Sequence, residues 1–113
     1  MTEKKLTDIL DSLIAVLQDR KSHPDEKSYT SLLFQQGETG IGEKILEEAQ
    51  ELVESAFESG EQADQHLIHE AADLLFHVMV LLVHKGLTLV EVRNELSRRF
   101  GTSGLEEKAS REK

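Results

Sequence analysis

Two pairs of acidic residues in this sequence have the spacing of neighbours on one face of a helix. Glu48 and Glu51 form an E-x-x-E pattern in "LEEAQEL" (46–52), and Glu70 and Asp73 form an E-x-x-D pattern in "HEAADLL" (69–75). Residues three apart project from the same side of a helix. If the two segments pack against each other antiparallel, we expect the four carboxylates to form one cluster.

Such a cluster requires compensation of its negative charge. Two unit charges about 5 Å apart repel by about 3 kcal/mol at an effective dielectric constant near 20. The acids therefore either take up protons, with raised pKa values, or surround a hard divalent cation. All-oxygen ligation favours Mg²⁺, with Mn²⁺ as a substitute, and we expect the metal. The plainer alternative is that these glutamates only solvate the outer face of a surface helix.

His77 lies on the same helical stripe as Glu70 and Asp73. We expect it to support the site through a hydrogen bond to one of these acids rather than to bind the ion. A di-iron carboxylate bundle is not predicted, because that architecture uses Glu-x-x-His pairs. None of the five histidines follows a glutamate at that spacing.

The periodicity of apolar residues predicts an all-α helical bundle of about five helices. Its core is expected to be a hairpin of two helices, at about 42–59 and 61–85, joined near Gly60. The remaining helices are predicted at about 6–20, 28–36 and 88–100, and the glycine-rich "GETGIG" (37–42) is predicted to be a connection. Gly60 and Gly86 stand where left-handed caps would end the two helices of the hairpin. Thr88 and Glu91 form a T-x-x-E capping box that opens the last helix.

The chain is expected to form a single domain, 1–113, in which about 101–113 are a C-terminal tail. Residues 67–83 are apolar almost all the way round the helix, more than so small a chain can cover. We therefore expect a homodimer to complete the bundle.

Composition excludes several classes of protein. The chain has 113 residues and a formal net charge of −9, which argues against a nucleic-acid partner, since clustered Lys and Arg bind phosphate backbones. The absence of cysteine excludes disulfides and zinc–thiolate sites. The most apolar run, 74–83, is too short to span a membrane. A cytoplasmic protein with no membrane partner is predicted.

The acidic pattern resembles the signature of the all-α nucleoside triphosphate pyrophosphatase superfamily, which includes MazG-type enzymes. Other segments are similar to the phosphoribosyl-ATP pyrophosphatase family of histidine biosynthesis, and the similarity covers nearly the whole chain. These segments are "SYTSLLFQQG" (28–37), "EKILEEAQELVESA" (43–56), "HEAADLLFHVMVLL" (69–82) and "RRFGTSGLEEKASR" (98–111).

The resemblance implies an ATP-binding, nucleotide-binding hydrolase that converts 1-(5-phosphoribosyl)-ATP to 1-(5-phosphoribosyl)-AMP and pyrophosphate, the second step of that pathway, by attack of a metal-activated water. It implies a dimer and Mg²⁺ held by Glu48, Glu51, Glu70 and Asp73. Lys44 matches a recurrent lysine of the family, whereas many relatives have glycine where this chain has Leu46. With no cysteine for the zinc site of the cyclohydrolase to which this enzyme is often fused, we expect the stand-alone pyrophosphatase.

Other residues are candidates by their chemistry. Either Glu47 or Glu51 accepts the proton of the attacking water. Phosphate groups beyond the metal need cationic donors, and ribose or phosphate oxygens need hydroxyls, although Ser28 equally suits a helix cap and the tail equally suits a solvated end. The candidate donors are Lys44, Arg98, Arg99, Lys108 and Arg111, and the candidate hydroxyls are Ser28, Tyr29 and Thr30.

Two rival functions share parts of this pattern. A house-cleaning pyrophosphatase of the MazG type, acting on nucleoside or deoxynucleoside triphosphates, would have the same metal site and a different base and sugar pocket. A non-enzymatic helical interaction module would use the apolar helix at 61–85 to dimerise, and its acids would be surface charge. Stabilisation by Mg²⁺ distinguishes the module from either enzyme.

Overall fold

The computed structural model describes the backbone of residues 2–100 and the side chains of residues 9–100. This part of the chain forms four α-helices and contains no β-strand. The all-α class expected from the sequence is therefore confirmed, and the predicted tail, 101–113, lies outside the described residues. The helices are α1 (Thr2–Ser22), α2 (Tyr29–Ser55), α3 (Ala63–His84) and α4 (Leu89–Phe100).

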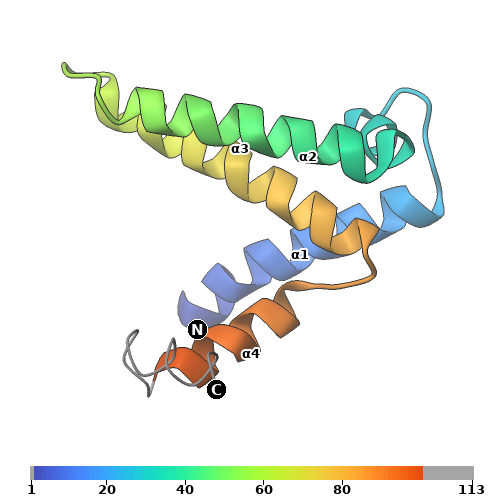
Figure 1. The fold of residues 1–113 in the computed structure, drawn as a ribbon. Helices are drawn as coiled ribbons and strands as arrows, with labels where there is room; N and C mark the ends of the chain where they lie inside the picture. Colours follow the sequence, from blue (N-terminus) through green and yellow to red (C-terminus); the bar gives the residue numbers. More distant parts are fainter. Residues whose placement is uncertain (1, 101–113) are drawn as a thin grey trace, which may run out of the picture.

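The predicted hairpin is present as α2 and α3, which run antiparallel and make the most extensive helix–helix contact of the fold (Figure 1). α1 packs against both of them near the end of the hairpin where α3 finishes. α4 lies apart from α2, beyond that end of α3 (Figure 1). The opposite end of the hairpin, around the α2–α3 turn, therefore projects away from α1 and α4.

The structure has four helices rather than five because α2 contains two of the predicted ones. Gly37 separates them: its φ of 70° and ψ of −166° are not helical and kink α2. That combination is accessible essentially only to glycine. The chain resumes the helix directly afterwards, so the prediction of a connection over 37–42 was wrong beyond its first residue. Ile41, fully buried, explains this, because its burial contributes about 1.5–3 kcal/mol and offsets the low helix propensity of the glycines beside it.

α2 ends at Ser55, not at the predicted Ser59. The Ser55 hydroxyl donates to the Leu52 carbonyl at 2.7 Å, and the backbone N–H groups of Phe57 and Glu58 each bond three residues back, at 3.1 and 3.2 Å. The chain thus tightens into turns before it reaches Gly60, whose φ is 109°. Gly60 serves the α2–α3 turn rather than a helix cap.

Both signals predicted around the start of α4 are confirmed. Gly86 has a φ of 79°, and the bonds Leu87 N–H to Leu82 O (2.8 Å) and Gly86 N–H to Val83 O (2.9 Å) form a Schellman motif that ends α3. The carboxylate of Glu91 then accepts from the Thr88 backbone N–H at 2.8 Å, as a capping box requires. The two motifs set the sharp change of direction between α3 and α4.

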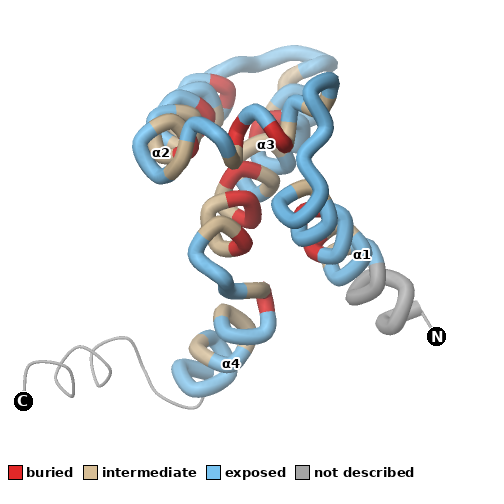
Figure 2. The backbone as a smooth tube through the Cα atoms, turned by 90° about the vertical axis from the view of Figure 1, so that its right-hand side faces the viewer, coloured by how far each residue is buried: buried red, intermediate tan, exposed pale blue. Residues whose placement is uncertain are grey.

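The hydrophobic core lies where α1, α2 and α3 meet (Figure 2). Its side chains come from all three helices, with α3 at the centre. The fully buried ones are Leu17, Leu33, Ile41, Met79 and Val80. α4 adds only Leu89 to this buried set within the described residues, and its outer surface is linked to α1 by an ion pair between Arg93 and Asp11 at 3.0 Å.

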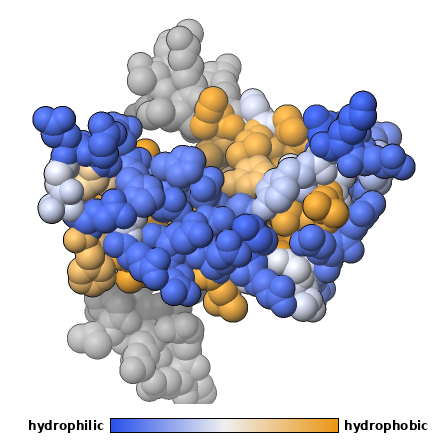
Figure 3. Space-filling model, turned by 90° about the horizontal axis from the view of Figure 1, so that it is seen from above, coloured by the Kyte–Doolittle hydropathy of each residue, from blue (hydrophilic) through white to orange (hydrophobic). Residues whose placement is uncertain are grey.

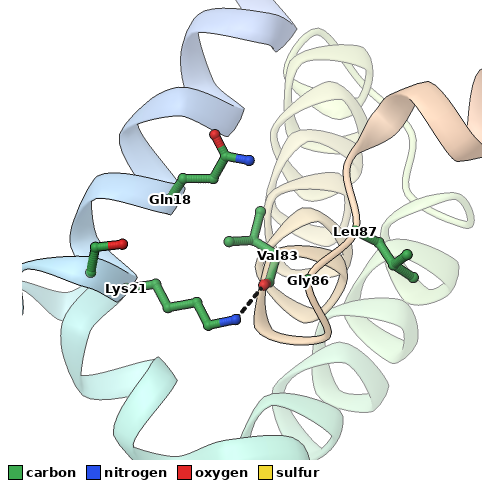
Figure 4. Close-up of a pocket in the computed structure, with 6 residues that line it drawn as sticks. Gln18, Lys21, Val83, Gly86 and Leu87 are labelled. Carbon is green, nitrogen blue, oxygen red and sulfur yellow. Dashed lines mark hydrogen bonds between the residues drawn. The ribbon is translucent and has the colours of Figure 1, made fainter.

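Lys21, near the end of α1, fixes that helix to the end of α3. Its Nζ donates to the carbonyl oxygen of Val83 at 3.0 Å (Figure 4) and to that of His84 at 3.0 Å. A cation is favourable there because helix C-termini carry unpaired carbonyls and partial negative charge. An open cavity of about 460 Å³ adjoins this contact. Its lining residues are Gln18, Lys21, Ser22, Val83, Gly86 and Leu87.

α3 is the one described helix that is long and apolar enough to cross a membrane. It also supplies Met79, Val80 and Val83 to the core and packs against both α1 and α2. Central helices of soluble proteins have the same length and composition, so α3 does not indicate a membrane protein.

Candidate metal centre and substrate site

The antiparallel hairpin brings the predicted acids of α2 and α3 together. Carboxylate oxygens of Glu48, Glu51 and Glu70 lie within 4.8 Å of one another. A second group, with ligand atoms within the same distance, consists of His69, Glu70 and Asp73. Glu70 belongs to both groups, so the four predicted carboxylates form one continuous centre across the two helices.

The two innermost acids of this centre are buried. Glu48 is 6 % exposed and Glu70 is 7 % exposed. The Oε2 atom of each has no hydrogen-bond partner among the described residues. Burial raises the pKa of Glu48, and the neighbouring charge of Glu51 and then of Asp73 raise it further. The site is therefore unfavourable for carboxylates unless something neutralises them.

The donor set fits a hard divalent cation. All donors of the Glu48, Glu51 and Glu70 group are carboxylate oxygens, the ligands that Mg²⁺ and Mn²⁺ prefer. Glu48 and Glu70 each have one buried oxygen with no partner among the described residues, and an ion held by this group would neutralise both side chains. Structural acids on a solvated helix face would instead be exposed, as Glu43 and Glu54 of the same helix are.

Lys44 lies one turn before the acids on α2. Its Nζ is 3.4 Å from Glu47 Oε1 and 3.6 Å from Glu48 Oε1. Burial acts to lower the pKa of Lys44, but the interaction with Tyr29, the hydrogen bond to Glu47 and the negative charges of Glu47 and Glu48 outweigh it, so the pKa is raised. A charged ammonium therefore stands at the edge of the centre, on the side of Tyr29.

His77 is buried and makes two hydrogen bonds. Its Nδ1 lies 2.7 Å from the backbone carbonyl of Asp73, and its Nε2 lies 2.9 Å from the Tyr29 hydroxyl. The carbonyl can only accept, so Nδ1 carries the proton and the tyrosine hydroxyl donates to Nε2. The expected link to Asp73 thus goes to its main chain and not to its carboxylate, because His77, one turn later, reaches back along the helix.

Two histidines of the site were not predicted. His66 bridges two carboxylates: Nδ1 is 2.8 Å from Glu58 Oε1, and Nε2 is 3.2 Å from Glu70 Oε1. The hydrogen bond to Glu58 raises the pKa of His66, and the charge of Glu70 acts in the same direction. His69 Nε2 lies 3.3 Å from Asp73 Oδ2. The spacing of four from His66 to Glu70 and from His69 to Asp73 was a visible signal for both pairs.

The remaining predicted residues lie elsewhere. The Ser28 hydroxyl caps α2 by accepting a hydrogen bond from the Ser31 N–H at 3.2 Å. This is the helix-capping role that the sequence offered as the alternative to substrate binding. Arg98 and Arg99 bind Glu95 within α4, through Nε–O distances of 3.1 and 2.9 Å, and hold the pKa of Glu95 at about 2. α4 is distant from the acidic centre within one chain (Figure 1). Thr30 is half-buried next to Tyr29 on α2, and Lys108 and Arg111 lie outside the described residues.

Comparison with known proteins shows the family to which the chain belongs. A family model described as phosphoribosyl-ATP pyrophosphohydrolase matches residues 10–100. A phosphoribosyl-ATP pyrophosphatase of Rhodopirellula baltica is 52% identical over 102 residues, which cover 90% of this chain and 85% of the relative. Proteins of the same name from Hydrogenovibrio crunogenus and Geobacter sulfurreducens are 44% and 47% identical, over 94% and 92% of this chain and 95% and 94% of their own length. The chain therefore belongs to the phosphoribosyl-ATP pyrophosphohydrolase family.

Proposed function

We propose that this protein hydrolyses 1-(5-phosphoribosyl)-ATP to 1-(5-phosphoribosyl)-AMP and pyrophosphate, in the cytoplasm, as the second step of histidine biosynthesis. The observation that carries the proposal is that Glu48 and Glu70, within the acidic centre, each have a buried carboxylate oxygen with no partner among residues 9–100. An anionic substrate approaches such a centre only with a cation. Relatives at 44–52% identity are named for this activity.

We assign Glu48, Glu51, Glu70 and Asp73 as the residues that hold Mg²⁺, for which Mn²⁺ substitutes. When bound, the ion neutralises the acids, screens the triphosphate and activates a water molecule. Glu51 and Glu47 are the candidates to accept the proton of that water. Glu47 is the exposed partner of Lys44, whereas Glu51 lies within the cluster.

The substrate phosphates and ribose need donors at the rim of the centre. Lys44 supplies a charged donor beside Glu48. The Tyr29 hydroxyl is oriented by His77, and its oxygen keeps acceptor capacity for a ribose hydroxyl or for Lys44. Thr30 follows on the same segment. The arginines of α4, Arg98 and Arg99, lie too far from this centre in one chain to act there, so their contribution to substrate binding requires a second copy of the chain.

We propose that the active protein is a homodimer formed through the open face of the α2–α3 hairpin. Large apolar side chains are exposed on both helices of that hairpin, and they interrupt an otherwise hydrophilic surface (Figure 3). They are Leu46 and Val53 of α2, Phe57 in the turn that follows it, and Ile68 and Leu75 of α3, between 43% and 85% exposed. In sedimentation velocity we expect Val53→Lys to give monomers and Val16→Lys, on α1, to remain dimeric.

The activity is tested by pyrophosphate release from phosphoribosyl-ATP and from a panel of nucleoside triphosphates, each with Mg²⁺ and with chelator. Turnover should require Mg²⁺ and be confined to phosphoribosyl-ATP. Glu51→Gln and Asp73→Asn should lower kcat at least 100-fold while helicity is unchanged, and Glu54→Gln, on the exposed side of α2, should not. Turnover of the panel instead would assign a MazG-type function, and full activity in both site variants would exclude the site.

A further inference from the structure

Tyr29 and His77 form a hydrogen-bonded pair beside the acidic centre. The Tyr29 hydroxyl lies 2.9 Å from His77 Nε2, and His77 Nδ1 lies 2.7 Å from the Asp73 carbonyl oxygen. We propose that Tyr29 is a specificity-determining residue that accepts a hydrogen bond from a hydroxyl of the adenosine ribose, and that His77 is the positioning residue that restricts Tyr29 to accepting. The inference rests on the proposed function, because it names a sugar contact of the same site.

The polarity of the pair follows from the Asp73 carbonyl. A carbonyl oxygen only accepts, so His77 Nδ1 carries the ring proton and Nε2 is the acceptor. The Tyr29 hydroxyl therefore donates its one proton to Nε2. The hydroxyl oxygen can then only accept from a substrate. An ionised phosphate offers acceptors alone, whereas a sugar hydroxyl offers a proton, so the sugar is the matching group.

The two side chains differ in exposure. His77 is 4% exposed, and its ring packs edge-on against Tyr29 and Phe76, with centroids 6.0 and 5.2 Å away. Tyr29 is 50% exposed, and its hydroxyl makes no other hydrogen bond in the part of the chain that the structure describes. A substrate can therefore contact Tyr29 but not His77, which acts only through the tyrosine.

The kink at Gly37 makes this contact possible. Gly37 turns the first segment of α2, 29–36, out of line with the rest of the helix (Figure 1). Tyr29 begins that segment and contacts α3 at His77. A straight helix would carry Tyr29 about 12 Å beyond Gly37 along the axis of α2. The kink therefore places a hydroxyl group at the acidic centre.

Tyr29 and Lys44 lie at the same end of the centre. His77 follows Asp73 by one turn on α3, and Lys44 precedes Glu48 by one turn on α2, which runs antiparallel. Tyr29 contributes to the raised pKa of Lys44, although no hydrogen bond joins these two described residues. A donor for phosphate and an acceptor for a hydroxyl thus stand together. Pyrophosphate release leaves one phosphate on the adenosine ribose, so this sugar adjoins the reacting phosphate.

Two analogues of phosphoribosyl-ATP, each lacking one of the two hydroxyls of the adenosine ribose, test the contact in a cycle with Tyr29→Phe. With the natural substrate, Tyr29→Phe should lower kcat/KM about 5- to 10-fold, as loss of one neutral hydrogen bond does. With the analogue that lacks the contacted hydroxyl, the same substitution should change kcat/KM by no more than about 2-fold. An equal effect of Tyr29→Phe on all three substrates would overturn the contact.

His77→Phe tests the positioning role. Its ring cannot accept the tyrosine proton, so the preference for the natural substrate over that analogue should fall toward the preference of Tyr29→Phe. His77→Gln, whose amide oxygen accepts, should keep more of it. The matched control is His84→Phe, because His84 lies on the same helix and stacks on Phe34 of the same α2 segment, with centroids 6.4 Å apart. The control should keep the full preference, and a full preference in His77→Phe would overturn the positioning role.

The outcome is separable from a defect in folding and from the proposed function. Circular dichroism and stabilisation by Mg²⁺ should match the wild type in each variant, and the half-exposed change Tyr29→Phe tests the contact even if His77→Phe does not fold. Turnover of phosphoribosyl-ATP by the wild type, with an equal effect of Tyr29→Phe on all three substrates, leaves the function intact and overturns the inference. No turnover of phosphoribosyl-ATP by the wild type overturns the function itself.

Discussion

Glu48→Gln should stabilise the metal-free protein at neutral and alkaline pH. Glu51 and Glu70 have oxygens within 4.8 Å of Glu48, and each repels it by about 3.5 kcal/mol at an effective dielectric constant near 20. Lys44, whose Nζ is 3.6 Å from Glu48 Oε1, attracts Glu48 by about 4.5 kcal/mol at the same dielectric constant. The net repulsion on Glu48 is therefore about 2.5 kcal/mol, and a neutral glutamine of the same shape removes it.

The pH dependence of this gain has a definite sign. The pKa of Glu48 is raised above its ordinary value of 4.5 in the folded protein, mainly by burial. Folded wild type therefore holds a proton that the unfolded chain releases, and its stability falls as the pH rises from 4.5 through the raised pKa. The difference between Glu48→Gln and wild type should be absent below pH 4.5 and reach about 2 kcal/mol above that window.

Urea denaturation followed by circular dichroism measures both effects, with chelator and with saturating Mg²⁺. At 100 times its dissociation constant, Mg²⁺ should stabilise the wild type by about 2.7 kcal/mol and Glu48→Gln by much less. Glu43→Gln, an exposed change on the same helix, is the control and should alter neither quantity. A variant less stable than wild type in chelator at pH 8, or equal stabilisation of both by Mg²⁺, would refute the reasoning.

Three further predictions concern the scaffold, each measured by urea denaturation. Leu33→Ala removes a fully buried side chain and should cost about 2–5 kcal/mol, whereas Leu32→Ala, half exposed, should cost far less. Gly37→Ala forces a side chain into the backbone of the α2 kink and should cost about 1–3 kcal/mol, whereas Gly42→Ala, with open space around it, should be neutral or stabilising. Glu91→Gln should be less stable than wild type above pH 4.5, and the difference should vanish at lower pH, because the backbone N–H at the start of α4 lowers the pKa of Glu91.

The features that sequence predicted well depend on residues close together in the chain. The E-x-x-E and E-x-x-D spacings fix which way the acids point on each helix, and one short turn then makes the helices antiparallel. The end of α3 and the start of α4 followed from Gly86 and the capping box for the same reason. Local chemistry determines all of these.

The features that the sequence analysis missed depend on contacts between residues distant in the chain, or on two local effects of opposite sign. The bond between Tyr29 and His77 joins residues 48 positions apart, and no spacing rule gives it. The continuous α2 reflects burial of Ile41, which outweighs weak local helix propensity. Arg98 and Arg99 were assigned to phosphate although Glu95 stands three and four residues before them, a local pairing that the sequence did show.

The acidic centre also decides against the plainer interpretation of its glutamates. Acids that serve only to solvate a helix gain nothing from burial, and selection for stability would leave them exposed, as Glu43 and Glu54 are. Glu48 and Glu70 instead lose hydration and face like charges, and each has an oxygen without a partner in the part of the chain that the structure describes. Lys44 offsets only part of that cost. A group of acids that destabilises the folded protein on its own is explained if it binds a ligand that offsets this cost. A divalent cation does so, because it neutralises the negative charge and coordinates carboxylate oxygens that have no partner among the described residues.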